Sequence, residues 1–119
     1  MKDFRDLTVW EKSHYLTLKI YKTTSKFPRE EIYGLTSQMR RSCSSIPANI
    51  AEGCGRSRDT ELARFLEIAI GSTSELEYQL LLSHELELIN DSDFKSLAAE
   101  TVEVKKMLIS FFKKLKANC

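Results

Sequence analysis

The sequence predicts an all-α fold, an antiparallel up-down four-helix bundle formed by a single domain spanning residues 1–119. Apolar residues recur at intervals of three or four positions in four separate stretches, which is the pattern of amphipathic helices. No stretch alternates apolar and polar residues over a useful length, and four Gly and two Pro are too few breakers for a many-turned β-protein. Amphipathic helices joined by short turns most economically form antiparallel neighbours.

The first predicted helix runs over about residues 7–26. Its apolar stripe contains Val9, Ser13, Leu16, Ile20 and Thr24. Pro28 ends the helix, because a proline disfavours helical geometry at the residue before it.

The second predicted helix contains six apolar residues at helical spacing: Ile32, Leu35, Met39, Cys43, Ile46 and Ile50. Pro47 lies inside this helix, where it costs about 3 kcal/mol and leaves the carbonyl of Cys43 without its helical donor. We expect a kink there, with the hydroxyls of Ser44 and Ser45 near the freed carbonyls. Gly53 is the expected C-terminal cap.

The third predicted helix begins within "SRDTE", where Ser57, Asp59 or Thr60 is the candidate cap. Its apolar pattern contains Leu62, Phe65, Leu66, Ala69, Thr73, Leu76, Leu80 and Ser83. The fourth helix is expected to be capped by Asp91 or Ser92. Its near-heptad pattern contains Phe94, Leu97, Thr101, Val104, Leu108, Phe111 and Leu115.

The last two helices carry more apolar surface than one bundle face can hide. Leu80, Leu81 and Leu82 surround most of a turn, and the segment from Met107 to Phe112 does the same. A helix that is apolar well beyond one stripe usually has a second partner, so we expect a homo-oligomer.

The net charge of +1 hides an uneven distribution along the chain. Residues 1–58 carry eleven Lys/Arg against six Asp/Glu, a net of +5, and residues 59–90 carry one Arg against seven acids, a net of −6. Residues 91–119 carry six Lys against four acids, a net of +2. Either charge pairing within or between subunits or a basic face for nucleic acid accounts for this pattern.

The candidate nucleic-acid contacts come from the basic half: Lys12, Lys19, Lys22, Lys26, Arg40, Arg41, Arg56 and Arg58. The four lysines recur at near-helical intervals opposite much of the apolar stripe, which is also the pattern of a solvated face. A second basic cluster contains Lys105, Lys106, Lys113, Lys114 and Lys116. No aromatic stacking platform is evident beside the basic residues.

A polar stripe lies one position off the apolar stripe of the second helix. With its counterpart on the third helix, this predicted seam contains Arg41, Ser45, Asn49, Glu52, Ser72 and Glu75, with Gln38, Ser42 and Gln79 in line. If the second and third helices form a hairpin about residue 56, residue i lies opposite residue 112 − i. Arg40 and Arg41 then lie level with about residue 72 and within one turn of Glu75, so we expect one of them to pair with Glu75. Glu52 is expected to meet Arg56 or Arg58. The seam would fix helix register or form an oligomer interface.

Nothing in the sequence predicts an enzyme. His14 and His84 are expected near opposite ends of the bundle, and no Glu-x-x-His pair exists for a di-iron site. Cys43 is expected to be buried, whereas Cys54 is placed in a turn near Arg56 and Arg58, where its pKa could be lowered. We therefore predict no catalytic residue, metal, cofactor or small-molecule substrate.

The three cysteines, including Cys119, share no metal-type spacing, which favours a reducing cytoplasm. The charged N-terminus lacks the apolar region of a signal peptide. No apolar run approaches the ~18 residues that cross a membrane, so no membrane partner is expected.

Three stretches together resemble one protein family: "FRDLTVW", "FPREEIYGLTSQMRRSCSSIPANIAEG" and "FLEIAIGSTSELEYQL". They are similar, over nearly the whole chain and in the same order, to the 23S rRNA intervening sequence protein family of bacterial four-helix bundle proteins. The strings "SIPANIAEG" and "GSTSELE" are the most specific part. The resemblance implies a bundle that assembles as a ring-shaped homopentamer.

The resemblance also extends to a related bundle, the accessory variability determinant of diversity-generating retroelements. That relative binds a reverse transcriptase and nucleic acid through a strongly basic surface, whereas this chain is nearly neutral and would need a local Lys/Arg patch. We therefore expect a binding or scaffolding module whose partner is RNA or an RNA–protein complex. The alternative is a protein–protein adaptor that binds no nucleic acid.

Overall fold

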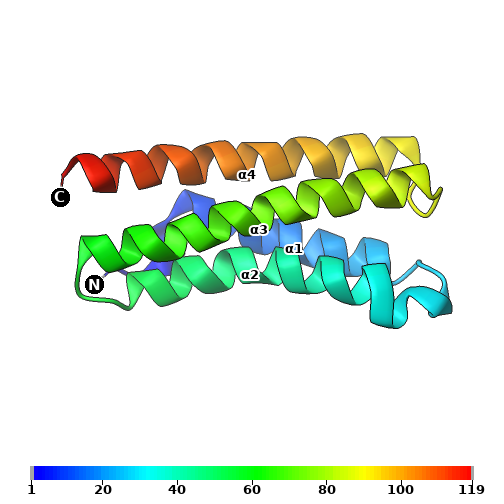
Figure 1. The fold of residues 1–119 in the computed structure, drawn as a ribbon, viewed down its shortest axis with the longest axis horizontal. Helices are drawn as coiled ribbons and strands as arrows, with labels where there is room; N and C mark the ends of the chain where they lie inside the picture. The colour runs from blue at the N-terminus through cyan, green and yellow to red at the C-terminus, as the bar shows by residue number, and fades with distance from the viewer. Residues whose placement is uncertain (1, 119) are drawn as a thin grey trace.

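The computed structural model describes residues 2–118 and contains four long helices (Figure 1). They are α1 (Thr8–Thr24), α2 (Ser37–Cys54), α3 (Asp59–Glu85) and α4 (Asp91–Ala117). No β-strand occurs between residues 2 and 118, and the chain measures 45 × 22 × 20 Å. The prediction of an all-helical fold with four helices is confirmed.

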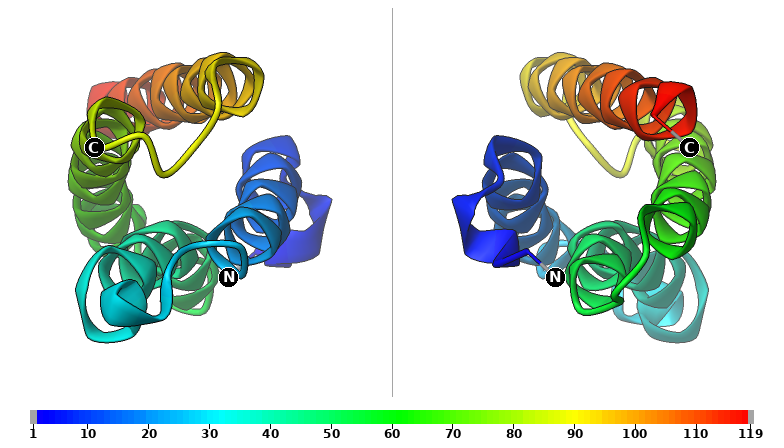
Figure 2. Two further views of the ribbon diagram at one scale, coloured as in Figure 1. Left: turned by 90° about the vertical axis from the view of Figure 1, so that its right-hand side faces the viewer. Right: turned by 90° about the vertical axis from the view of Figure 1, so that its left-hand side faces the viewer.

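The helices follow one another around the bundle, each antiparallel to the one before it (Figures 1 and 2). Helix α2 contacts both α1 and α3 extensively, and α3 contacts α4 extensively. The contact between α1 and α4 is the least extensive of the four neighbouring pairs. The side of the bundle between α1 and α4 is therefore its most open side.

The core contains most of the apolar stripes that helical spacing predicts; Ile32, predicted in the stripe of the second helix, is instead 47% exposed. All five stripe residues of α1 are buried, as are Leu62, Leu66, Ala69, Leu76 and Leu80 of α3 and Leu97, Val104, Leu108 and Leu115 of α4. A fully buried Leu or Ile side chain contributes about 1.5–3 kcal/mol relative to an exposed one, so these stripes are the main source of stability. Of the apolar excess, Leu81 is exposed, whereas Met107, Phe111 and Phe112 are half-buried against the core.

The segment before α2 departs from the predicted helix. Residues Arg29–Glu31 form a 3₁₀ turn and Ile32–Thr36 a π-helical turn, in which Gly34 has non-helical backbone angles. The carboxylate of Glu31 accepts a hydrogen bond from the amide of Leu35 at 3.1 Å. Helix α2 therefore begins at Ser37, five residues after Ile32.

Pro47 is accommodated within one continuous helix, because α2 extends from Ser37 to Cys54. The hydroxyl of Thr17 on α1 lies 3.3 Å from the carbonyl oxygen of Cys43, the group that Pro47 leaves without a helical donor. The expectation that Ser44 or Ser45 fills this role was wrong. Ser44 donates to the carbonyl of Arg41, and Ser45 bonds to Ser72 of α3.

Gly53 is not the C-terminal cap, since α2 continues to Cys54 and Gly55 is the cap. Gly53 lies where α2 and α3 approach closely. A Cβ atom at this position would lie 2.8 Å from Cδ1 of Leu62 and 3.0 Å from Cβ of Phe65. The glycine is required by packing rather than by a turn.

The helix caps also differ from those predicted. Arg58 is the N-cap of α3 and makes no side-chain capping bond, whereas Asn90 caps α4 by accepting from the amide of Asp93 at 2.7 Å. Helix α3 ends in a Schellman motif: the amide of Leu88 donates to Ser83 and the amide of Glu87 to His84. Glu87 has φ 62°, a conformation that glycine usually provides.

Candidate nucleic-acid interface

The structure does not bring the eight predicted basic residues together. Some are paired within the protein, and others are exposed without a partner. They also lie in different places: across the open side of the bundle, between α1 and α2, and at the α2–α3 turn. Their surroundings decide which of them are available to a ligand.

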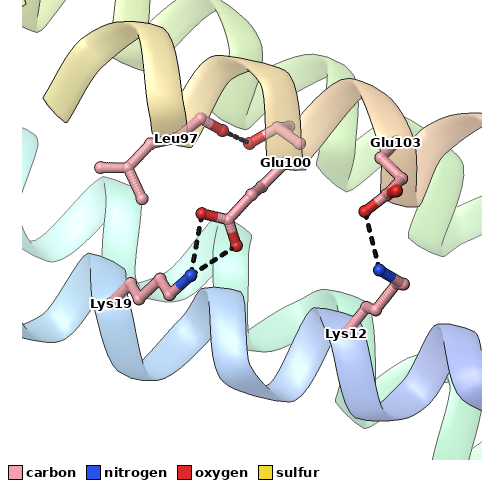
Figure 3. Close-up of polar contacts among 6 residues, drawn as sticks. Lys12, Lys19, Leu97, Glu100 and Glu103 are labelled. Atoms are coloured by element: carbon pink, nitrogen blue, oxygen red, sulfur yellow. Dashed lines mark hydrogen bonds and ion pairs between the residues drawn. The ribbon is translucent and has the colours of Figure 1, made fainter. Parts of the chain in front are cut away.

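Lys12 and Lys19 cross the open side of the bundle to α4 (Figure 3). The ammonium of Lys12 lies 3.0 Å from Glu103, and that of Lys19 lies 2.9 and 3.0 Å from the two carboxylate oxygens of Glu100. The two pairs line a groove of about 530 Å³ between α1 and α4. Their positive charge is therefore balanced within the subunit.

Lys22 lies near the C-terminal end of α1, and Lys26 lies in the turn that follows this helix. Both are exposed, and neither side chain is paired with a described residue. They line a smaller hollow of about 260 Å³ that also contains Lys19 and Asp93. Neither lysine therefore has its charge neutralised by a direct ion pair with a described residue.

Arg40 is fixed against α1 by three contacts. Its Nε donates to the hydroxyl of Thr24 at 2.8 Å, and its Nη2 donates to the carbonyl of Tyr21 at 3.1 Å. Its guanidinium also lies 4.7 Å from the centroid of the Tyr21 ring, a cation–π geometry. The Thr24 hydroxyl in turn donates to the carbonyl of Ile20, so the hydroxyl is oriented to accept from Arg40.

Arg41 is exposed beside this arrangement, and its side chain is not paired with a described residue. Both arginines border a hollow of about 570 Å³, called here the α1–α2 hollow, lined by Tyr21, Ile32, Thr36, Ser37, Arg40, Arg41 and Ser44. The hollow combines an aromatic ring, three hydroxyl groups and a positive charge without a partner. That combination suits a phosphate-bearing ligand with a planar base.

No aromatic side chain was expected beside the basic residues, but two lie there. Tyr21 contacts Arg40, and Tyr33 is 96% exposed on the adjacent π-helical turn. The contact between Tyr21 and Arg40 joins two helices across a break. Residue spacing within one helix therefore carries no signal of it.

Arg56 and Arg58 lie at the turn between α2 and α3. Arg56 bonds to Glu52 at 2.7 Å, as predicted, and its guanidinium lies 5.0 Å from the Phe65 ring. Arg58 lies 4.0 Å from the carboxylate of Glu61. Both arginines therefore face acidic groups of their own subunit.

The polar seam between α2 and α3 rests on hydroxyl and amide groups. Ser45 bonds to Ser72 at 2.9 Å, and the amide of Asn49 donates to the hydroxyl and carbonyl of Ser45. Ser42 donates to the buried side chain of Gln79 at 2.6 Å.

The predicted pair between Arg40 or Arg41 and Glu75 does not exist among residues 2–118, because Arg40 turns toward α1 and both Arg41 and Glu75 are exposed. The predicted alignment sets Ser45 opposite residue 67, five residues before its actual partner, Ser72. Helix α3 begins only at Asp59, after the connection from Gly55 to Arg58. A later start of α3 sets residues of higher number opposite each residue of α2.

A family model that describes the 23S rRNA-intervening sequence protein matches residues 5–110. The chain belongs to this family. The matched region includes all of α1, α2 and α3 and most of α4, and it contains the α1–α2 hollow and the polar seam.

A solved structure supports the same fold for this member of the 23S rRNA-intervening sequence family. It is a protein of unknown function from the S23 ribosomal protein family of Bacteroides thetaiotaomicron, 29% identical to this chain with a TM-score of 0.80. The alignment covers 89% of this chain and 99% of that one. No protein with a curated description matches this chain.

The two cysteine thiols among residues 2–118 are buried. Burial raises the pKa of Cys43 to about 11, against the smaller effect of a hydrogen bond with Thr17. Cys54 was expected in an exposed turn, but it is the last residue of α2 and only 1% exposed. Burial raises the pKa of Cys54 as well, so the predicted lowering was wrong. Cys119 lies outside the described residues.

The two histidines lie in separate aromatic contacts. His14 stacks on Trp10 at 5.0 Å between ring centroids, whereas His84 stacks on Phe94 at 4.2 Å and bonds to Asp91. Over residues 2–118 no three His, Cys, Asp or Glu side chains are grouped to hold a metal ion. Over the same residues, no helix is both long and apolar enough to cross a membrane.

Proposed function

We propose that this protein is a non-enzymatic, self-assembling helical bundle that serves as a binding or scaffolding module in the cytoplasm. Its partner on this proposal is RNA or an RNA–protein complex, bound at the α1–α2 hollow. The family name links the chain to the intervening sequence of 23S rRNA and assigns it no activity. The proposal therefore rests on the chemistry of the hollow.

The observation that supports the proposal is that Arg40, which is fixed against α1, lies next to Arg41, whose side chain has no partner among the described residues. Arg40 is held over the Tyr21 ring by two hydrogen bonds to α1, and the Tyr21 side chain remains 44% exposed. Arg41 next to it has no partner among the described residues and is free to bind a phosphate. A base stacked on an aromatic ring contributes about 1–3 kcal/mol, and a phosphate contact positions the strand.

Two further lysines lie near this end of α1, on its side toward α4. Lys22 on α1 and Lys26 in the turn after it form no ion pair with a described carboxylate. By contrast Lys12, Lys19, Arg56 and Arg58 face carboxylates of their own subunit. We therefore narrow the nucleic-acid contacts to Arg40, Arg41 and Lys26; Lys22, also unpaired, is assigned below to the contact between copies.

Self-assembly is the second part of the proposal, and a pentameric ring is the assembly we expect. Tyr15 and Leu18 on α1 and Ile68, Tyr78 and Leu81 on α3 are large apolar side chains left exposed by the single chain. A monomer that exposes apolar groups on two helices has surface available for contacts between copies. A ring would also repeat the α1–α2 hollow once per subunit, which increases avidity for a long ligand.

Fluorescence anisotropy with a labelled single-stranded RNA and a labelled RNA hairpin tests the binding. We expect binding at about 50 mM salt that weakens steeply by about 200 mM, because phosphate contacts release counterions. Arg41→Ala should weaken binding and reduce the salt slope by about 1. Lys113→Ala, an exposed lysine near the end of α4, is the matched control and should leave the slope unchanged.

Two outcomes contradict the proposal: no binding to either RNA at low salt, and binding without a salt slope. Equal effects of Arg41→Ala and Lys113→Ala would show that RNA binds by general charge rather than at the hollow. Circular dichroism of each variant establishes that the helices are intact.

One observation favours the alternative of a protein–protein adaptor. The groove between the N-terminal end of α1 and the C-terminal half of α4 holds about 450 Å³ and is lined by Leu7, Val9, Met107 and Phe111. An apolar floor of this kind suits a protein helix rather than a nucleic acid. Loss of partner binding in Met107→Glu, with RNA binding absent in the wild type, would favour the adaptor.

A further inference from the structure

The exposed faces of α1 and α3 carry matching patterns. On α1, Glu11, Tyr15, Leu18 and Lys22 follow one another at intervals of four, three and four residues, so they share one face of the helix. On α3, Arg64, Ile68, Gly71 and Glu75 follow at the same three intervals. All eight residues are exposed in the single chain.

The charged ends of both faces are without partners. The side chains of Glu11 and Lys22 on α1 and of Arg64 and Glu75 on α3 make no ion pair with a described residue. Most other charged residues of α1 and α3 that face a neighbouring helix are paired within the chain, as Lys19 is with Glu100 and Glu77 with Lys105. These four charges are therefore available to pair with a second molecule.

The middle of both faces is apolar. Tyr15 is 55% exposed, Leu18 52% and Ile68 46%. Gly71 lies inside α3, where glycine is disfavoured relative to alanine, and a Cβ atom there would meet nothing within 4 Å. Packing within the subunit does not account for this glycine, whereas close approach by a side chain of another molecule does.

We infer that α3 of one copy docks in parallel on α1 of the next copy. Aligned in parallel, the two faces set Glu11 against Arg64, Tyr15 against Ile68, Leu18 against Gly71 and Lys22 against Glu75. Each charge pair then joins opposite signs, and the side chain of Leu18 meets Gly71, which has no side chain. The antiparallel alignment would set Glu11 against Glu75 and Lys22 against Arg64, which are repulsive pairs.

The architecture of the bundle fits this arrangement. Helices α1 and α3 run in the same direction and are separated by α2 on one side and α4 on the other (Figures 1 and 2). Their outer faces therefore point to opposite sides of the subunit. Pairing α3 with α1 of a neighbour uses two different surfaces and leaves one of each free at the ends, which is the head-to-tail geometry that closes into rings.

This inference rests on the self-assembly part of the proposed function and specifies the surfaces that perform it. Light scattering and native mass spectrometry of the wild-type chain test the first step. A wild-type monomer at micromolar concentration would overturn self-assembly itself. An oligomer that persists in the variants below would overturn only the choice of surfaces.

Charge reversal tests the pairing. We expect Lys22→Glu and Glu75→Lys each to weaken self-association about tenfold or more, because each creates a like-charge contact. The double variant Lys22→Glu/Glu75→Lys should restore association, since it restores opposite charges with the signs exchanged. Lys95→Glu, an exposed charge on α4, is the matched control. Failure of the double variant to recover would contradict the Lys22–Glu75 contact.

Disulfide cross-linking tests the register. In a Cys119→Ser background, Leu18→Cys and Gly71→Cys in one chain should link neighbouring copies into covalent oligomers under mild oxidation. Leu18→Cys with Ala99→Cys, an exposed position on α4, should not. Equal cross-linking of both variants would contradict the proposed register.

Discussion

The hydroxyl of Thr17 on α1 lies 3.3 Å from the carbonyl oxygen of Cys43 on α2, the carbonyl that Pro47 deprives of its donor. The same hydroxyl lies 2.8 Å from the carbonyl of Ser13 in its own helix. One side chain thus joins two helices at the point where the second lacks a backbone hydrogen bond.

Thr17→Val should destabilise the protein by about 1 kcal/mol, because it removes a hydrogen bond to a partly buried carbonyl while keeping the shape of the side chain. In a Pro47→Ala background the effect should be smaller, since the amide of residue 47 can then donate to Cys43. Urea unfolding of the four variants at one protein concentration measures the coupling. Additive effects would show that Thr17 does not compensate for Pro47.

Gly53→Ala should destabilise the fold by about 1–3 kcal/mol through overpacking. The added methyl group would lie 2.8 Å from Leu62 and 3.0 Å from Phe65, so α2 and α3 would have to separate. Gly55→Ala is the matched control, because its Cβ would meet only backbone oxygens at 3.3 Å or more. Thermal unfolding compares the two. A Gly53→Ala variant as stable as the wild type would contradict the close approach of the two helices.

The pair formed by Asp91 and His84 should make stability depend on pH in acid. The hydrogen bond from His84, followed by the charge of that ring and by Lys95, lowers the pKa of Asp91 below its ordinary value of 3.8. The carboxylate therefore stabilises the folded state above about pH 3.8, and this contribution is lost as the pH falls through the lower folded pKa.

The test is urea unfolding at pH 6 and at pH 2.5 in wild type and Asp91→Asn. The variant should be less stable than wild type at pH 6, and the difference should shrink at pH 2.5. Asp59→Asn, in the equivalent first turn of α3, controls for the helix dipole without a histidine partner. The same pH profile in both variants would assign the effect to the helix terminus rather than to His84.

Cys43 and Cys54 should react slowly with iodoacetamide at pH 7. Burial keeps both thiols protonated and out of contact with the reagent. In a Cys119→Ser variant, intact-mass measurement should show an unmodified native chain and two added groups in denaturant. Rapid modification of Cys54 in the native protein would mean that the end of α2 opens readily.

The helical stripes could be predicted from the sequence because a period of 3.6 residues reports directly which side of a helix is buried. The five stripe positions of α1 show this, since every one is buried. The helix ends were less predictable. Asn90 rather than Asp91 caps α4, because a cap depends on a few backbone angles. Gly53 is explained by the close approach of α3 rather than by a turn, and that approach depends on the neighbouring helix.

The candidate site was harder to predict than the fold. Charge alone could not separate Lys19, which Glu100 balances, from Lys22, which has no acidic partner among the described residues. The decisive contact, Arg40 over Tyr21, joins residues on either side of an irregular turn. Its formation depends on how the π-helical turn directs α2 back along α1, and no residue pattern encodes that direction.

The sparse contact between α1 and α4 predicts that α1 is the helix that separates most readily from the bundle. The ion pairs Lys12–Glu103 and Lys19–Glu100 join the two helices on this side, and their side chains are exposed or half-exposed. Such surface pairs contribute only about 0–1 kcal/mol to stability. Backbone amides of α1 should therefore exchange with solvent before those of α2 and α3. Docking of a neighbour on α1 would slow that exchange, so the protein concentration would set how tightly each subunit stays closed.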